Sequence, residues 1–214
     1  MTTLRDIRSP LAVPAAYWLV QRLLGASAVH RRVVEHHARV RPGLRVLDIG
    51  CGPGRVLDVL PDVDYLGLDV SEEYIAAARN RYGDRAAFRC TDAASADLAG
   101  EAPFDVVLMM GVLHHLDDGA AGRVVALAAD ALDRSGRLVT LDPARTADQA
   151  AVARWLTGRD RGAAIRAPDA YRAIAEPCFA SVAASVYDDL ARVPYTHVVL
   201  ECERPRAVPQ TPHA

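Results

Sequence analysis

Lysine is absent from this 214-residue sequence, in which arginine supplies all 25 positive side chains against 27 acidic ones. The formal net charge of −2 lacks the basic excess with which proteins commonly bind nucleic acid or anionic membranes. Because alanine is also abundant, the arginine usage is more typical of GC-rich coding than of a recognition surface. We therefore expect a small-molecule partner, no nucleic acid and no membrane.

Cysteine is scarce and scattered, and the sequence has no long apolar run. Cys51, Cys90, Cys178 and Cys202 form no CxxC pair, so neither a zinc site nor a secreted disulfide scaffold is indicated. No run of about 18 apolar residues is long enough for a membrane span, and residues 1–10 lack the apolar core of a signal peptide. We expect a cytoplasmic protein with reduced thiols and no metal.

The length and the 51% hydrophobic content suffice for one sizeable core but are short for two full domains. Helical spacing of apolar residues predicts an N-terminal helical cap over residues 1–41. The main domain is expected over 42–204. Residues 205–214 contain three prolines and are expected to form a disordered tail.

Strand-like and helical segments alternate along the main domain. The strand candidates are 45–49, 64–70, 86–90, 104–110, 136–142, 179–187 and 196–202. The helical candidates are 54–60, 71–83, 118–133 and 146–176. Ser71, followed by two glutamates, is a good helix start, and Gly83 fits the end of that helix. Strands separated by helices require parallel crossovers, so we predict a wound α/β sheet.

A glycine-rich loop, Asp48-Ile49-Gly50-Cys51-Gly52-Pro53-Gly54, follows the first strand candidate. Ligands of open α/β sheets bind outside the carboxyl ends of the strands, although a tight turn also needs small residues. The spacing is GxGxG rather than the dinucleotide pattern GxGxxG, and Asp48 would repel a pyrophosphate. Because its carboxylate would attract an ammonium group, the loop favours an aminoacyl-type cofactor over a dinucleotide.

Two further acidic residues stand at the next strand ends. Asp69 closes the second strand candidate, where a carboxylate can accept both hydroxyls of a ribose. Asp92 follows the third and could accept from an adenine amino group. Taken singly, Asp69 could cap a helix and Asp92 could be a solvated loop residue. Acids at three successive strand ends are a less ordinary arrangement.

These motifs together resemble those of class I S-adenosylmethionine-dependent methyltransferases of the small bacterial type. The resemblance covers about residues 42–143 and is carried by 46–54, Asp69, Asp92, 104–108 and 136–139. It implies an α/β, Rossmann-like, seven-stranded sheet that is mostly parallel with the last strand antiparallel. It also implies helices on both faces and an N-terminal helical lid.

The resemblance also assigns cofactor contacts for S-adenosyl-L-methionine and its product S-adenosyl-L-homocysteine. The methionine end would be held by Asp48, Gly50, Cys51 and Gly52. The ribose would be held by Asp69 and Val70, and the adenine by Asp92 and Ala93. Met110 and Gly111 would contact the sulfonium side.

The segment after the fourth strand candidate supplies the catalytic hypotheses. His114 is the first choice for a general base and His115 the second. The alternative is that both are only packing or hydrogen-bonding residues in the wall of the acceptor cavity. Adjacent histidines do not share a helical face, so metal chelation is not indicated. Asp142, after the fifth strand candidate, could orient an acceptor or belong to a turn.

Four residues are expected to contact the acceptor: Tyr17, Arg161, Arg166 and Tyr195. Arginine forks would suit an anionic acceptor, and a solvated helix face is the alternative. The function expected is SN2 transfer of a methyl group to a small molecule. A methyltransferase of nucleic acid or protein, or a binding protein of this fold without methyl transfer, are the alternatives.

Overall fold

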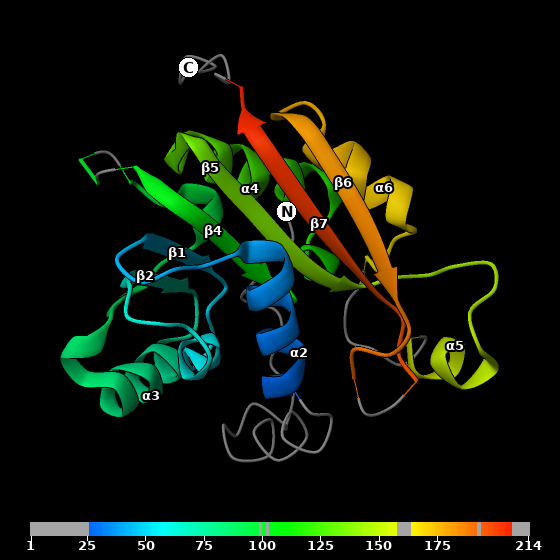
Figure 1. Ribbon diagram of the computed structural model, residues 1–214, viewed down its shortest axis with the longest axis horizontal. Coiled ribbons are helices and arrows are strands. Elements are labelled where there is room, and N and C mark those ends of the chain that lie inside the picture. The colour runs from blue at the N-terminus through cyan, green and yellow to red at the C-terminus, as the bar shows by residue number, and fades with distance from the viewer. Residues whose placement is uncertain (1–25, 99, 102, 158–163, 192–193, 207–214) are drawn as a thin grey trace.

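The computed structural model describes residues 26–98, 100–101, 103–157, 164–191 and 194–206 (Figure 1). Most of the expected helical cap, with Tyr17, and most of the expected tail lie outside the described residues. Arg161 lies outside them too. Within the described ranges, no helix is long and apolar enough to cross a membrane.

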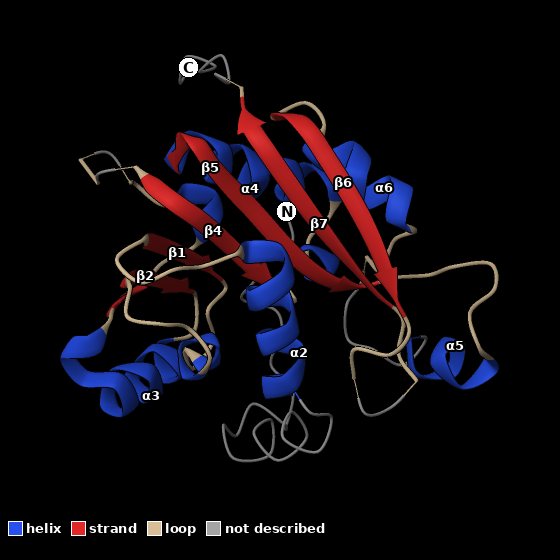
Figure 2. Ribbon diagram, in the orientation of Figure 1, coloured by secondary structure: helices blue, strands red, loops and turns tan. Residues whose placement is uncertain are grey.

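One seven-stranded sheet organises the chain. Its strands are β1 Arg45–Ile49, β2 Asp64–Asp69, β3 Ala87–Cys90, β4 Phe104–Met110, β5 Leu132–Pro143, β6 Phe179–Tyr187 and β7 His197–Pro205. The spatial order is β3-β2-β1-β4-β5-β7-β6 (Figure 2). Strands β1 to β5 pair in parallel, whereas β7 is antiparallel to both β5 and β6. The predicted mostly parallel sheet with an antiparallel last strand is confirmed.

Helices cover both faces of this sheet (Figure 2). They are α2 Ala26–Val33, α3 Glu72–Tyr82, α4 Asp118–Ala131, α5 Ala151–Thr157 and α6 Pro168–Ala175. A five-residue π-helix, Val34–Ala38, extends α2. Short 3₁₀ turns occupy Arg55–Asp58, Gly83–Arg85, Ala93–Ser95 and Leu113–His115.

The two faces of the sheet carry two separate cores because successive strand residues point in opposite directions. Leu47 and Ile49 of β1 pack with residues of α4 and α6 on one face. Val46, the neighbour of Leu47, packs with residues of α2 and α3 on the other. Both faces of the central strands are therefore buried, and ligands can reach the sheet only at its ends.

Helix α3 begins and ends where the sequence predicts. The Ser71 hydroxyl accepts the backbone N–H of Tyr74 at 3.3 Å, and glutamates occupy the first turn. Gly83 ends the helix with a positive φ of 53°, which favours glycine.

Two helical predictions were too long. The segment 54–60 forms only the 3₁₀ turn Arg55–Asp58, because Gly54 at φ 73° and Pro61 leave room for little more than a turn. The segment 146–176 divides into α5 and α6, and Pro168 stands at the start of α6, a position that proline favours.

Candidate functional site

The carboxyl ends of the parallel strands meet at one edge of the sheet, which is where ligands of such folds bind. The ends of β1, β2 and β4 bring the glycine-rich loop, Asp69 and Gly111 to this edge. The end of β5 brings Asp142, since Met110 pairs with Leu141 in the β4–β5 register. The candidate site is built here.

The glycine-rich loop turns sharply against the end of β2. The backbone N–H groups of Gly50 and Cys51 both donate to the carbonyl of Leu68, at 2.8 and 3.0 Å. Gly50 has φ 72°, and a Cβ there would lie 2.6 Å from Cγ2 of Val112. Gly52 has φ 53°, and no atom of the described residues lies within 4 Å of such a Cβ. The described residues thus pack closely against the loop at Gly50 but not at Gly52.

Asp48 contributes a buried carboxylate directly beneath this loop. Its side chain accepts the Tyr65 hydroxyl at Oδ2, at 2.6 Å, and the residue is 2% exposed. Its other oxygen, Oδ1, is buried without a hydrogen-bond partner among the described residues. Burial raises the pKa of Asp48 to about 7, against the lowering effect of the Tyr65 hydrogen bond. An unpaired buried acceptor of this kind fits a ligand that brings its own ammonium donor.

Asp69 joins the loop to the start of α3. Its Oδ2 accepts the N–H of Gly52 at 2.8 Å, and its Oδ1 accepts that of Ser71 at 2.9 Å. Burial raises the pKa of Asp69. A carboxylate has about four acceptor positions, so these two bonds leave capacity for hydroxyl donors. The structural role at the helix start and the predicted ribose contact are therefore compatible.

Asp92 and its neighbours form the third part of the predicted cofactor site. Oδ1 of Asp92 accepts the N–H of Ala94 at 2.9 Å and caps the turn Ala93–Ser95, in which Ala93 is buried. Val70 is 37% exposed at the end of β2, and the exposed Cys90 lies beside it, with Sγ 3.5 Å from the Val70 carbonyl. The adenine contact assigned to Asp92 stays a prediction.

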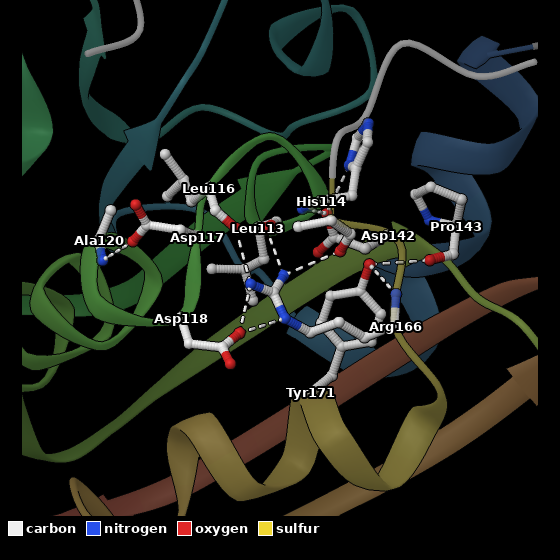
Figure 3. Close-up of polar contacts among 11 residues, drawn as sticks. Leu113, His114, Leu116, Asp117, Asp118, Ala120, Asp142, Pro143, Arg166 and Tyr171 are labelled. Carbon is white, nitrogen blue, oxygen red and sulfur yellow. Dashed lines mark hydrogen bonds and ion pairs between the residues drawn. The ribbon is translucent and has the colours of Figure 1, made fainter. Parts of the chain in front are cut away.

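Two of the predicted catalytic residues, His114 and Asp142, lie together (Figure 3). Nδ1 of His114 is 2.8 Å from Oδ1 of Asp142, which also accepts the backbone N–H of His114 at 3.1 Å. The ring of His115 lies against that of His114, with 3.9 Å between centroids. Asp142 is fully buried, which raises its pKa, and its Oδ2 has no hydrogen-bond partner among the described residues. When Nδ1 donates to Asp142, Nε2 of His114 is left as a proton acceptor.

Arg166 and Tyr195, which were expected to contact the acceptor, instead contact other groups of the protein. The guanidinium of Arg166 is turned toward carbonyl groups of the protein itself, and the ring of Tyr195 lies 5.1 Å from that of His197. No three His, Cys, Asp or Glu side chains within the described ranges are arranged to hold a metal ion.

Tyr65, the partner of Asp48, was not predicted from the sequence. Tyr65 pairs with Val46 in the β1–β2 register, so its side chain lies on the same face of the sheet as that of Asp48. The two-residue alternation of β2 was the available signal, because it points Tyr65 and Gly67 to one face.

Known proteins are similar to this chain in sequence and in fold. Residues 46–136 match the family model described as a methyltransferase domain. A ubiquinone biosynthesis O-methyltransferase from Sinorhizobium medicae is 40% identical over 101 residues, which are 42% of this chain and 40% of the relative. A 27-O-demethylrifamycin SV methyltransferase from Amycolatopsis mediterranei is 35% identical over 111 residues, 48% of this chain and 40% of the relative. The chain thus aligns with two fifths of the length of each of these relatives.

Solved structures show the same fold at low identity. A phosphoethanolamine N-methyltransferase from Haemonchus contortus superposes with a TM-score of 0.76 at 13% identity, covering 96% of this chain and 61% of that one. Magnesium protoporphyrin IX methyltransferase from Synechocystis, with bound S-adenosylhomocysteine, gives a TM-score of 0.62 at 22% identity, covering 88% and 87%. Residues 46–136 thus resemble a methyltransferase domain, and the chain has the fold of these two methyltransferases, both solved with bound S-adenosylhomocysteine.

Proposed function

We propose that this chain is an enzyme that transfers a methyl group from S-adenosylmethionine to an oxygen atom of a small-molecule acceptor. The observation that carries the proposal is the buried His114–Asp142 pair, at 2.8 Å, beside the glycine-rich loop. A hydroxyl group loses its proton when it is methylated, and this pair offers a base for that proton. Two relatives whose names specify oxygen methylation support the choice of acceptor atom.

The cofactor would be held by residues whose chemistry suits each of its parts. The unpaired Oδ1 of Asp48 suits the methionine ammonium, and Asp69 suits the ribose hydroxyls. The remaining predicted contacts are Gly50, Cys51, Gly52, Val70, Asp92, Ala93, Met110 and Gly111. When bound, the cofactor supplies a methyl group already activated by its sulfonium sulfur.

The protein's own contribution is to bind, orient and take up a proton. Oδ1 of Asp142 holds the imidazole of His114 through Nδ1, which fixes the tautomer in which Nε2 accepts. The acceptor proton passes to Nε2, and the negative charge of Asp142 stabilises the resulting imidazolium. The ring of His115 lies tilted by 39° against that of His114, with 3.9 Å between centroids, and so limits the space in which the His114 ring can turn.

The N-terminal segment 1–41 completes the proposed architecture as a cap on the main domain 42–204. Its described helix α2 packs on the same face of the sheet as α3, through Val29 and Val33. An anionic acceptor would need contacts from arginines of the segment after β5.

The test is incubation with methyl-labelled cofactor and a bacterial small-molecule extract, followed by mass spectrometry. A labelled, O-methylated product with the wild type, and far less with His114→Gln, is expected. Label found in nucleic acid or protein would redirect the proposal to a macromolecular acceptor. Calorimetric heat with NAD and none with S-adenosylhomocysteine would overturn the cofactor assignment.

A further inference from the structure

Arg166, which precedes α6, donates to several acceptors that surround the turn Leu113–His115 (Figure 3). Nη1 donates to the carbonyls of Leu113 at 2.8 Å and Ala164 at 3.0 Å, and Nη2 donates to that of Leu116 at 2.7 Å. Nε donates to Oδ1 of Asp118 at 2.9 Å. The side chain is only 9% exposed, and its guanidinium forms hydrogen bonds mainly with backbone carbonyls of the protein itself.

Two of the carbonyls that Arg166 binds, those of Leu113 and Leu116, lie on either side of His114 in the sequence. The carbonyl of His114 itself accepts the N–H of Ala164 at 3.0 Å, from the same segment as Arg166. On its other side, Oδ1 of Asp142 binds both the N–H and Nδ1 of His114. The backbone of the turn is therefore held between the Arg166 segment and the end of β5.

A single 3₁₀ turn needs such support. The Leu113 carbonyl also accepts the N–H of Leu116 within the turn, at 3.2 Å. The later carbonyls have no donor inside the turn, and buried carbonyls without a donor are costly. A guanidinium offers five N–H donors in a rigid plane, which can bind several carbonyls at once. Lysine has three donors on a flexible stem and cannot reproduce this geometry.

The segment that carries Arg166 also contacts the residue after Asp142. The hydroxyl of Tyr171, in α6, donates to the carbonyl of Pro143 at 3.0 Å and lies 3.4 Å from the backbone nitrogen of Arg166. Both members of the His114–Asp142 pair thus have neighbours bound by the same short region.

We infer that Arg166 is a positioning residue, which fixes the turn Leu113–His115 so that His114 keeps its hydrogen bond to Asp142 and directs Nε2 toward the acceptor. The inference rests on the proposed function for its catalytic consequence, but its structural part does not. It replaces the expectation that Arg166 binds the acceptor, since its three nitrogens all donate to protein groups.

The first experiment needs no acceptor. Proton–nitrogen spectra of ¹⁵N-histidine-labelled protein should show His114 in one tautomer with a hydrogen-bonded Nδ1–H, assigned by its loss in His114→Gln. Arg166→Met should broaden or shift this signal, and Arg166→Lys should shift it to a smaller extent. Asp118→Asn is the matched control, because it weakens one exposed contact and leaves the carbonyl bonds intact, so its signal should match the wild type.

The second experiment measures turnover and binding separately. Arg166→Met should lower kcat by about 100-fold, the scale of a small misplacement of a catalytic group, with the Kd for S-adenosylhomocysteine unchanged. Arg166→Lys should fall between this variant and the wild type. If Arg166 instead binds the acceptor, KM rises while the His114 signal stays intact, and that result overturns the inference.

Each remaining outcome is also decisive. Should Arg166→Met fail to fold by circular dichroism, Arg166→Lys decides, and an unchanged His114 signal in that variant overturns the inference. Should the wild type methylate nothing, the proposed function fails, while the spectra of the same variants still report whether Arg166 positions His114.

Discussion

Asp48 and Asp142 each use one carboxylate oxygen for hydrogen bonds, to the Tyr65 hydroxyl and to two nitrogens of His114 respectively. Each buries its other oxygen without a hydrogen-bond partner among the described residues. A buried acceptor without a partner costs roughly 1–3 kcal/mol, so its presence calls for an explanation. Both lie at the sheet edge where a ligand would bind. A donor brought by a ligand would satisfy each oxygen, which makes these two residues the sharpest places to test the site.

Asp48→Asn should weaken the binding of S-adenosylhomocysteine by about 10- to 100-fold, because a charge-assisted hydrogen bond contributes roughly 1.5–3 kcal/mol. The pKa of Asp48 is raised to about 7, so acidification through this value protonates the carboxyl group and removes its attraction for an ammonium. Wild-type affinity, measured by isothermal titration calorimetry, should therefore fall as the pH falls through about 7.

Tyr65→Phe is the matched control, since it removes the partner of Oδ2 and leaves Oδ1 in place. Its hydrogen bond lowers the pKa of Asp48, so its loss should move the midpoint of the pH dependence upward. An asparagine variant that binds as tightly as the wild type, with the same pH profile, would remove Asp48 from the cofactor site.

His114→Gln and Asp142→Asn should each lower turnover by roughly 10²- to 10⁴-fold with little change in cofactor affinity, as expected for loss of a general base or of its orienting partner. Turnover retained in both variants would mean that the pair only lines the wall of the acceptor site.

At the scale of elements, the glycine-rich loop fits against β2 only because β2 has a glycine there. A Cβ on Gly67 would lie 2.8 Å from Sγ of Cys51 and 2.9 Å from Cδ1 of Phe88, closer than such atoms approach. Gly67→Ala should lower the free energy of unfolding by about 1–3 kcal/mol and also weaken cofactor binding, because the clash pushes on the loop. Urea titration and calorimetry measure the two effects.

Gly122→Ala, in α4, is the control for Gly67→Ala. An added Cβ has no atom of the described residues within 4 Å, and alanine favours the helix. The free energy of unfolding of this variant should therefore rise by about 0.5–1 kcal/mol. Cofactor affinity should not change. If Gly67→Ala behaves like Gly122→Ala, the close fit between β2 and the loop does not position the site.

The elements themselves were largely predictable. Strands β1, β4 and β6 have the predicted bounds, because each apolar run is bounded by turn residues and has the length of a strand. The start of α3 followed from the local chemistry of Ser71. The π-helix after α2 and the short turn after Gly54 were not predicted, since local patterns there also fit an ordinary helix.

Which residues of the site contact one another was harder to predict from the sequence than which residues belong to it. Asp142 and His114 were each singled out, but they are 28 positions apart, and their contact depends on the register of β4 and β5. Arg166 reaches Leu113 across 53 positions, and an arginine-rich segment gives no local sign of which guanidinium turns inward. Such contacts depend on how segments distant in the sequence pack together, which hydrophobic periodicity does not determine.

At the scale of the whole molecule, Asp48 and His30, both on the side of the sheet covered by α2 and α3, give opposite pH dependences. Burial raises the pKa of Asp48 from 3.8 to about 7, so its contribution to stability is lost as the pH rises between these values. Burial lowers the pKa of His30, in α2, from 6.5 to about 4. Nδ1 of His30 is buried with no hydrogen-bond partner in the part of the chain that the structure describes. The stability of the wild type alone therefore cannot separate the two groups.

Replacing His30 separates them. Between pH 6.5 and 4 the unfolded chain binds a proton at His30 that the folded chain does not, so wild-type stability is lost as the pH falls through this window. His30→Met removes that proton uptake and suits a helix. Relative to the wild type, the free energy of unfolding of His30→Met should rise by up to about 3 kcal/mol as the pH falls, since each pKa unit corresponds to about 1.4 kcal/mol.

Denaturant unfolding followed by circular dichroism, at several values across this window, measures the difference between the two proteins. His36→Met is the control, because His36 is exposed in the π-helix Val34–Ala38, and the stability of this variant should run parallel to that of the wild type across the window. A constant difference between wild type and His30→Met at every pH would mean that His30 takes up its proton equally in the folded and unfolded chains. In that case α2 does not shield His30 from solvent, and the acid sensitivity of the fold arises elsewhere.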